Sequence, residues 1–427
     1  MGNKMTTTNI GVLPEELLTE VLVQLPVKTI GVCKLVCKPW LSLISNPDFI
    51  NSHVHYVTDN NNNPTLLDII SPNLSNVVHN VPRVVPINGD MQALHDILHN
   101  MFALLRSIEE RLYRSWMLND RDGHDLSSCN VRFDRVVIPS VFRDSRVVGA
   151  SCCNGIVCLT DDDVVYLWNP LIRRCKEVGV PELDVDSSSG VRIGFGYDSG
   201  CNDYKVFRTF WDGDLDSVTL KLQVYSVNGD SWGEFRGPVW GKGNNVGEEK
   251  LEGNDFVVVK EILYFSSWDE QHLIAFDLRK EVIGLVPFPS FVLKKCSDVL
   301  DFKDSIAVVF KSVSGIDLWK LNDNVWGQVS SWTKMFSIAP DDPHPKLKMW
   351  LSCYLGAGQF FGRKLLDGNV FMFNVLYDCE KKETKYYGVG KENILATLKY
   401  RETLVSLDGF HQVEENADQY SLTQETI

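Results

Sequence analysis

The clearest pattern in this chain lies at residues 13–50, which read LPEELLTEVLVQLPVKTIGVCKLVCKPWLSLISNPDFI. Pro14 suits the first turn of a helix, because its missing N–H would be unpaired there in any case. Pro26 ends that helix, since proline disfavours helix in the residue before it. Between the two prolines, apolar residues recur at steps of one, three and four, as on one helix face: Leu17, Leu18, Val21, Leu22 and Leu25.

Two further apolar faces follow in the same stretch. Residues 27–37 carry one, and residues 40–44 carry the other, which ends before Pro47. Three helices in so short a segment cannot bury all these faces on one another. We therefore expect the following domain or a partner protein to cover part of them.

The composition is that of an ordinary globular protein, with 44% hydrophobic and 23% charged residues among 427. A formal net charge of −14 repels phosphate backbones, and no basic stripe offsets it, so we expect no nucleic-acid partner. No apolar run is long enough to span a membrane. Eleven cysteines at irregular spacings lie mostly beside apolar residues, which favours buried thiols over disulfides and a location in the cytoplasm or nucleus.

Residues 1–10 read as a disordered leader, with one targeting pattern in it. Met1-Gly2 followed by Thr6 fits the N-myristoylation pattern, which makes Gly2 a candidate lipidation site. A single acyl chain binds membranes only marginally, and Lys4 is the one nearby basic residue. An unmodified leader is therefore the preferred interpretation, and we expect no stable membrane insertion.

From about residue 147 the pattern changes to short β-branched and aromatic runs separated by Gly, Asn and Asp. Turn residues predict five β-hairpins there. Their strand pairs are 156–159 with 164–168, 221–227 with the run after Asn228-Gly229, 261–266 with 273–278, 305–310 with 315–321, and 370–376 with 384–389. Aromatic residues recur in these pairs about every forty to seventy residues, near the repeat length of propeller blades. Closing such a ring removes exposed sheet edges.

The segment between these two regions is mixed. Residues 57–64 read as a polar break and 65–86 as short extended segments. At about 90–118, apolar residues step by three and four and form a heptad-like seam. This helical insert could lie on the β-domain, or it could pair with a partner helix or with a second copy in a homodimer.

Residues 13–49 resemble an F-box of the plant type, through Leu13-Pro14-Glu15-Glu16-Leu17-Leu18, Leu25-Pro26-Val27, Trp40 and Pro47-x-Phe49. Gly31 and Val32 depart from that pattern. The resemblance implies a three-helix unit that docks on the Skp-type adaptor of a cullin ubiquitin ligase. The adaptor-binding residues it implies are Leu13, Pro14, Leu17, Leu18, Val21, Leu22, Leu25, Pro26, Val27, Cys33, Val36, Trp40, Leu43, Ile44 and Pro47.

The second half resembles the F-box-associated domain of plant F-box proteins of the kelch-repeat type. The strings that carry the resemblance include Ser151-Cys152-Cys153-Asn154-Gly155, Leu167-Trp168-Asn169-Pro170, Gly194-Phe195-Gly196-Tyr197-Asp198, Ser231-Trp232 and Ser331-Trp332. Where the family often has Asn-Gly, this chain has Lys260-Glu261, so we expect that hairpin to be built differently.

The resulting fold class is a small all-α F-box followed by an all-β, propeller-like (kelch-like) domain with a helical insert. The expected divisions are a leader at 1–10, the F-box at 11–56, a linker with first strands and the insert at 57–146, the propeller-like domain at 147–410, and a polar tail at 411–427.

Signals for catalysis and for metals are weak. His95 and His99 have the spacing of two metal ligands on a helix, but no third ligand is evident. The stretch at 212–216 begins like a calcium loop but lacks its glycine and its closing glutamate. The glycines at 194 and 196 read as strand and turn rather than as a dinucleotide motif. We expect no catalytic residues, no cofactor and no metal.

The resemblance therefore implies a non-catalytic, substrate-recognition subunit of an SCF-type ubiquitin ligase, with an unknown protein target bound by the β-domain. The alternative is a propeller that binds a carbohydrate or a small molecule and uses the adaptor only as a scaffold. Several predicted loops are acidic and carry tryptophans, a combination suited to a basic partner. The candidate target-binding residues are Trp211, Asp212, Asp214, Asp216, Trp240 and Trp268.

Overall fold

The computed structural model describes residues 14–60, 65–70, 131–139, 142 and most of 149–413. Within the last range it leaves out 161–163, 182–190, 214–216, 242–255, 268–270, 290–295, 304, 313–314, 324–330, 339–347, 367–370 and 390–393. The leader at 1–10, the helical insert at about 90–118 and residues 414–427 of the predicted polar tail lie outside the described residues, whereas residues 411–413 of that tail are described.

The N-terminal region forms four helices: α1 (Glu15–Val23), α2 (Val27–Cys33), α3 (Lys38–Ser45) and α4 (Pro47–Asn60). Pro14 precedes α1 and Pro26 precedes α2, where each accepts a hydrogen bond from the backbone N–H four residues later. The predicted polar break at 57 is wrong for its first residues, because α4 continues to Asn60. Phe49 and Val54 of α4 are buried, and this packing sustains the helix beyond its local propensity.

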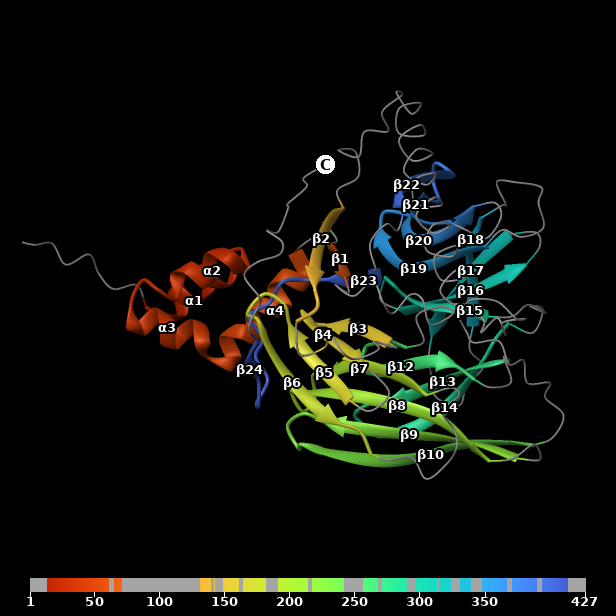
Figure 1. Ribbon diagram of the computed structural model, residues 1–427, viewed down its shortest axis with the longest axis horizontal. Helices are drawn as coiled ribbons and strands as arrows, with labels where there is room; N and C mark the ends of the chain where they lie inside the picture. The colour runs from red at the N-terminus through yellow and green to blue at the C-terminus, as the bar shows by residue number, and fades with distance from the viewer. Residues whose placement is uncertain are drawn as a thin grey trace, which may run out of the picture.

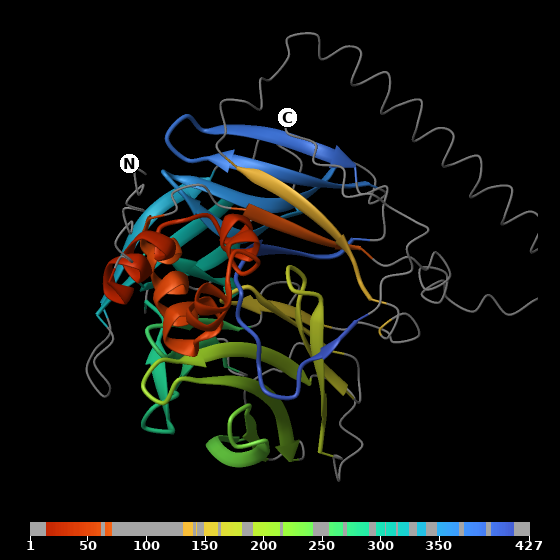
Figure 2. The same ribbon diagram turned by 90° about the vertical axis from the view of Figure 1, so that its left-hand side faces the viewer.

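The rest of the described chain forms strands in six sheets. These sheets are arranged as a ring and are the blades of a propeller (Figures 1 and 2). Blade 1 holds β1 (Thr65–Ile70), β2 (Arg132–Val137) and β23 (Ile394–Tyr400); blade 2 holds β3 (Gly149–Cys153), β4 (Ile156–Thr160), β5 (Val164–Asn169), β6 (Arg174–Gly179) and β24 (His411–Gln412). Blade 3 holds β7 (Arg192–Asp198), β8 (Asp203–Gly213), β9 (Ser217–Ser226) and β10 (Ser231–Gly241); blade 4 holds β11 (Val257–Val259), β12 (Ile262–Ser266), β13 (His272–Asp277) and β14 (Val282–Pro287). Blade 5 holds β15 (Cys296–Phe302), β16 (Ser305–Ser312), β17 (Gly315–Asp323) and β18 (Ser331–Ile338); blade 6 holds β19 (Lys348–Gly356), β20 (Gln359–Leu366), β21 (Phe371–Asp378) and β22 (Glu383–Val389).

Each pair of neighbouring blades shares an apolar cluster, and the clusters close the ring. Leu67 and Leu159 belong to the cluster between blades 1 and 2, and Leu66 joins Phe361 and Leu376 between blades 6 and 1. Four more clusters fill the other junctions. The core of this domain is therefore distributed over six inter-blade seams.

Blade 1 joins the two ends of the propeller. Its strand β1 pairs in parallel with β2 and antiparallel with β23, with Thr65 opposite Tyr400. The ring thus begins at residue 65, inside the segment 57–146 that the sequence assigns to a linker, first strands and a helical insert. Strands far apart in the chain complete this one sheet. Near the C-terminus, β24 adds a fifth strand to blade 2 through β6.

The five predicted hairpins are confirmed as β4–β5, β9–β10, β12–β13, β16–β17 and β21–β22. The hairpin at Lys260-Glu261 is not built differently, contrary to the expectation. Val259 pairs with Ile262, and the two residues between them have φ of 49° and 62°, as in a two-residue type I′ turn. The pairing of the strands imposes a left-handed conformation that Asn-Gly would adopt more easily.

Three of the family-like strings have a direct packing role. A Cβ at Gly194 would lie 2.7 Å from Phe256, and one at Gly196 would lie 2.7 Å from Val258, so the inner strands of blades 3 and 4 approach closely only because both residues are glycine. Trp232 Nε1 donates to Gly179 O of the preceding blade at 2.9 Å. Trp332 Nε1 donates in the same way to Pro287 O at 2.9 Å.

The Lys260-Glu261 turn yields a stability prediction. Lys260→Asn should raise the free energy of unfolding by about 0.5–1 kcal/mol, because asparagine tolerates the left-handed conformation better than lysine does. Lys260→Val removes the same charge but places a β-branched side chain there, and should lower it by about 1 kcal/mol or more. Urea unfolding of the three chains measures both effects. Shifts of the same sign in the two variants would contradict a conformational cause.

Candidate functional site

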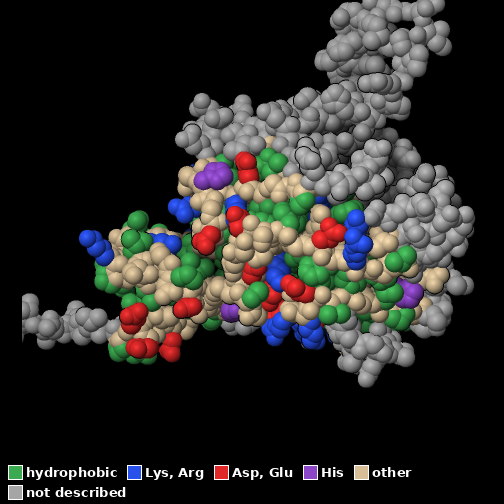
Figure 3. Space-filling model, turned by 90° about the horizontal axis from the view of Figure 1, so that it is seen from below, with side chains coloured by type: hydrophobic (Ala, Val, Ile, Leu, Met, Phe, Trp, Pro, Cys, Tyr) green, Lys and Arg blue, Asp and Glu red, His purple; other side chains and the backbone are tan. Residues whose placement is uncertain are grey.

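The helical region carries an unusual amount of exposed apolar surface. Of nine large hydrophobic side chains that are exposed among the described residues, six lie there: Leu17, Val21, Val32, Leu35, Val36 and Leu41. Leu35 is 84% exposed, and Val32 and Val36 are each more than 60% exposed. Apolar side chains reach the surface of this region at the left of Figure 3. Exposed apolar patches are typical of protein interaction sites. We call these six residues the apolar docking face.

Three of these six residues, namely Leu17, Val21 and Val36, are among those that the sequence assigns to adaptor binding. Val32, Leu35 and Leu41 are not among them, because a helical pattern does not show which of its apolar positions remain outside the core. Leu35 and Val36 lie in the turn between α2 and α3, where helical periodicity gives no orientation. The one available signal was Val32, which the sequence marked as a departure from the F-box pattern.

The other predicted adaptor-binding residues are placed differently. Leu22, Val27 and Ile44 are buried in the helical core, at 1%, 7% and 0% exposure. These three residues belong to the core of the helical region and not to its exposed surface. The half-buried residues Leu18, Leu25, Cys33, Trp40 and Leu43 pack against that core. Pro14, Pro26 and Pro47 are exposed, and Leu13 lies outside the described residues.

The helical region is fixed to the propeller by apolar packing. Leu404, from the segment after β23, belongs to the helical core, and Leu171 and Ile172 of blade 2 pack against it. On the other side of α4, Val54 joins the cluster between blades 2 and 3. The apolar docking face is therefore presented by a helical unit whose inner side the propeller covers, as the sequence led us to expect.

Polar contacts hold α4 both to the rest of the helical region and to the propeller. Within the helical region, the ring of buried His53 contacts Leu25 O through Nε2 at 3.0 Å and lies parallel to the ring of Phe49. Asn51 Nδ2 of α4 donates to Asn202 Oδ1 in the β7–β8 turn at 3.1 Å. The β7–β8 turn therefore lies on the side of the ring that carries the helices, and the far ends of β8 and β10 lie on the opposite side.

The candidate target-binding residues follow from that orientation. Trp211 and Asp212 lie near the end of β8, and Trp240 lies near the end of β10, so all three positions fall on the side opposite the helices. Strand β9 lies between β8 and β10 and pairs with both of them. Trp211 of β8 is opposite Leu220, and Trp240 of β10 is opposite Val218. Asp214, Asp216 and Trp268 lie outside the described residues.

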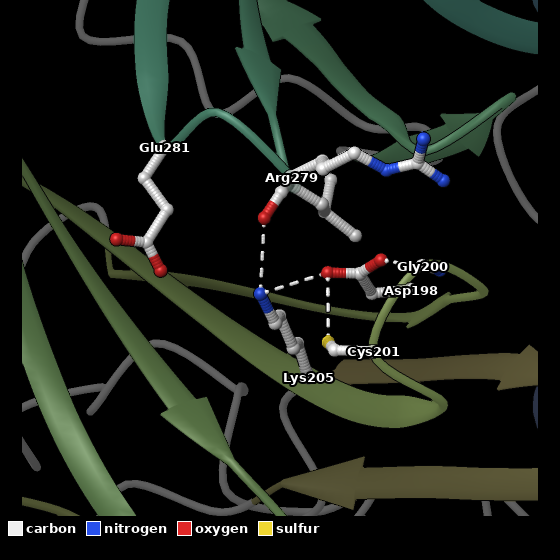
Figure 4. A pocket seen from close by; sticks show the side chains of 7 residues that line it. Asp198, Gly200, Cys201, Lys205, Arg279 and Glu281 are labelled. Carbon is white, nitrogen blue, oxygen red and sulfur yellow. Dashed lines mark hydrogen bonds and ion pairs between the residues drawn. The ribbon is translucent and has the colours of Figure 1, made fainter.

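A cavity of about 570 Å³ lies between the β7–β8 turn and the β13–β14 turn, on the helix-bearing side of the ring (Figure 4). Inside it Lys205 Nζ lies 3.1 Å from Asp198 Oδ2 and donates to Leu278 O at 3.0 Å. Burial by itself would raise the pKa of Asp198, but hydrogen bonds from Cys201, Lys205 and the Gly200 N–H outweigh it and hold that pKa below its usual value.

These contacts connect blades 3 and 4 at the cavity, because Asp198 and Lys205 belong to blade 3 and Leu278 follows β13 of blade 4. Its seven lining residues include no aromatic side chain on which a sugar ring could stack, and its buried charges are already paired. The cavity therefore does not favour the alternative of a carbohydrate-binding propeller.

Three thiols of blade 2 are held in their protonated form by burial. Burial raises the pKa of Cys153 and of Cys158 to about 12, and that of Cys175 to about 11. Within the described ranges, no group of three or more His, Cys, Asp and Glu side chains could hold a metal ion. No described helix is long and apolar enough to cross a membrane.

The Cys201 thiol should react slowly in the folded protein. Burial raises the pKa of Cys201 to about 11, together with the Asp198 carboxylate, which accepts a hydrogen bond from the thiol. At pH 8 iodoacetamide should alkylate Cys201 about tenfold more slowly in the folded protein than in about 8 M urea, because a lower thiolate fraction is only partly offset by greater nucleophilicity. Peptide mass spectrometry measures both rates. Equal rates in the folded and the unfolded protein would contradict the Asp198–Cys201 interaction.

Comparison with known families and relatives agrees with this architecture. The F-box domain family matches residues 10–52, and the family described as the F-box associated beta propeller domain matches residues 124–411, more than half of the chain. An F-box/kelch-repeat protein of Arabidopsis thaliana is 24% identical over 76% of this chain and 79% of its own length. A putative F-box protein of the same plant is 21% identical over 78% and 80%. The Arabidopsis F-box protein CPR1 is 22% identical over 76% and 73%. This chain therefore belongs to the F-box proteins that carry an F-box-associated β-propeller domain.

Proposed function

We propose that this protein is a substrate-recognition subunit of an SCF-type cullin ubiquitin ligase. The F-box binds the Skp-type adaptor, and the propeller binds a protein target. The protein itself contributes binding and no chemistry, because raising the local concentration of a target lysine near the conjugating enzyme is enough to accelerate transfer. Its place of action on this proposal is the cytoplasm or the nucleus.

One observation carries the proposal: the apolar docking face is exposed while the rest of the F-box core is covered by the propeller. An isolated apolar face of this kind is unfavourable in water. Its presence on a domain that the family match identifies as an F-box supports an adaptor that covers it. Central apolar residues of such interfaces supply most of the binding free energy.

The adaptor interface can be tested without unfolding the F-box. Val21→Asp with Val36→Asp changes two side chains that are 56% and 61% exposed, so the thermal midpoint should stay within about 2 °C. Adaptor affinity should fall at least a hundredfold, since each change places a charge in an apolar interface at a cost of about 2 kcal/mol or more. Isothermal titration with the purified adaptor measures the affinity. Val239→Asp, at 64% exposure on β10, is the matched control and should bind normally. Normal binding by the double variant would refute the adaptor-docking proposal.

We further propose that the target binds on the side of the ring opposite the F-box. Ten non-glycine residues in the described part of the chain have positive φ, and all of them lie in turns on the F-box side, such as Asn154 and Asn202. Short turns of this kind leave little surface to vary. The strands that flank the connections between blades end on the opposite side, and these connections are longer in sequence, for example 180–191 and 242–256. Loops on a rigid scaffold are the usual recognition elements.

The Val21→Asp/Val36→Asp variant also serves as a trap, because it should bind its target without passing it to the ligase. Proteins that this variant retains should be lost when Trp211→Ala and Trp240→Ala are added, because buried tryptophans dominate such interfaces. Neutralising Asp212, Asp214 and Asp216 to asparagine should mainly slow association, and less so at high salt. Quantitative mass spectrometry of the retained proteins, with Trp232→Phe as the tryptophan control, measures the loss. Retention of the same proteins by every variant would place the target site elsewhere.

A further inference from the structure

The segment after β23 runs between the F-box and the propeller, and we call residues 401–413 the C-terminal strap. Leu404, 8% exposed, belongs to the F-box core together with Leu22, Ile30 and Ile44. The next residue, Val405, is 6% exposed and belongs to the cluster between blades 2 and 3. At the far end of the strap, Val413 is 4% exposed and belongs to the cluster between blades 1 and 2. The strap thus contributes a side chain to three separate cores.

A buried asparagine fixes the strap beside Leu404. Asn169 is fully buried at the end of β5, and its Nδ2 donates to Thr403 O at 3.1 Å and to Val405 O at 2.8 Å. Its Oδ1 accepts the Leu171 N–H at 3.0 Å, so each end of the amide has a defined partner. The two carbonyls that Asn169 binds flank Leu404 on both sides, which leaves the leucine side chain directed to the F-box core.

The β3–β4 turn forms the second attachment. Thr403, 1% exposed, donates through Oγ1 to Asn154 O at 2.7 Å. Gly155 has φ of +75°, and a Cβ there would lie 2.5 Å from Arg401 O and 2.5 Å from Thr403 Oγ1. Any side chain at position 155 would therefore push the strap away. The family-like strings Asn154-Gly155 and Asn169-Pro170 both make contact with the strap.

One ion-pair network also spans the junction. Glu402 Oε1 lies 3.2 Å from Lys28 Nζ of α2 and 3.7 Å from an Arg132 nitrogen of β2. The Lys28 side chain is 54% exposed, so this pair contributes little to stability and mainly reflects the position of the strap. The apolar packing and the buried hydrogen bonds carry the attachment.

We propose that the C-terminal strap is a structural part of the F-box, which completes the F-box core through Leu404 and holds the F-box in one orientation on the propeller. Without Leu404, the core beneath the docking face has a cavity on its propeller side. A smaller fraction of the molecules then holds the F-box in its binding-competent conformation. The apparent affinity for the adaptor falls by the same factor as this fraction. This last consequence rests on the proposed adaptor-binding function, whereas the structural part does not.

Hydrogen–deuterium exchange on the full chain, without adaptor, tests the proposal. Leu404→Ala should speed exchange of α1–α3 amides at least tenfold, because those helices lose a core contact. Leu376→Ala is the matched control: it truncates a leucine that is 2% exposed in the cluster between blades 6 and 1, and α1–α3 should not respond. If Leu404→Ala does not fold, Leu404→Val removes a single methylene and should give the same effect on a smaller scale.

A second variant tests the attachment by Asn169. Asn169→Asp has nearly the same shape but replaces the donor that serves two carbonyls with an acceptor. Exchange should rise in residues 401–405 and in α1–α3 together. Faster exchange in the strap alone, or unchanged exchange of α1–α3 in the Leu404 variants, would overturn the proposal.

The adaptor titration separates the two proposals. If wild-type protein fails to bind the adaptor while Leu404→Ala speeds exchange in α1–α3, the adaptor-binding function fails and the role of the strap stands. If wild type binds and the Leu404 variants bind equally well with unchanged exchange, the strap proposal fails and the function stands.

Discussion

The antiparallel pairing of β1 with β23 is the constraint on which the rest of the structure depends. It joins residue 65 to residue 400, so that the two ends of the propeller lie in one sheet and no blade is left with an open junction. The same pairing places the F-box. Helix α4 ends just before β1, and the C-terminal strap begins just after β23, so the two segments that hold the F-box leave the same blade side by side (Figure 2). The pairing of β1 with β23 therefore both closes the ring and places the F-box.

This arrangement explains why the F-box has two chemically different sides. The sequence led us to expect three helices and the structure has four, but a unit of this size still has too little volume to bury its own apolar residues. On the inner side the deficit is met by Leu171, Ile172 and Leu404, and the core residues Leu22 and Ile44 are almost completely covered. On the outer side nothing in the described chain covers Leu35 or its neighbours in the docking face. The propeller thus stabilises the F-box without occupying the surface available to a partner.

Local chemistry made much of this fold predictable, and contacts between distant residues account for what was missed. Prolines and apolar spacing located the helices, and turn residues located five hairpins, because both signals act within a few residues. The pairing of Asp68 with Thr397, 329 residues apart, has no local signature, so the sequence predicted extended segments from residue 65 but not the blade that they complete. For the same reason Asn169 and Gly155 were recognised as family-like strings while their partners, more than 230 residues away, were not. The sequence likewise separated the apolar residues of the F-box from the polar ones, but could not tell Leu22, which lies inside, from Val21, which lies outside.

The two sides of the ring are under different physical constraints. On the F-box side, connections are tight turns with left-handed residues, and several of them contact α4 or the strap, as Asn202 and Asn154 do. A longer loop there would displace the F-box, so the length of these turns is fixed by packing. On the opposite side three strands of blade 3, β8, β9 and β10, extend for ten or eleven residues, and their far ends lie away from the F-box. Changes in the connections between blades alter one surface without disturbing ring closure or F-box placement. A scaffold of this kind can change what it recognises while its docking face stays the same.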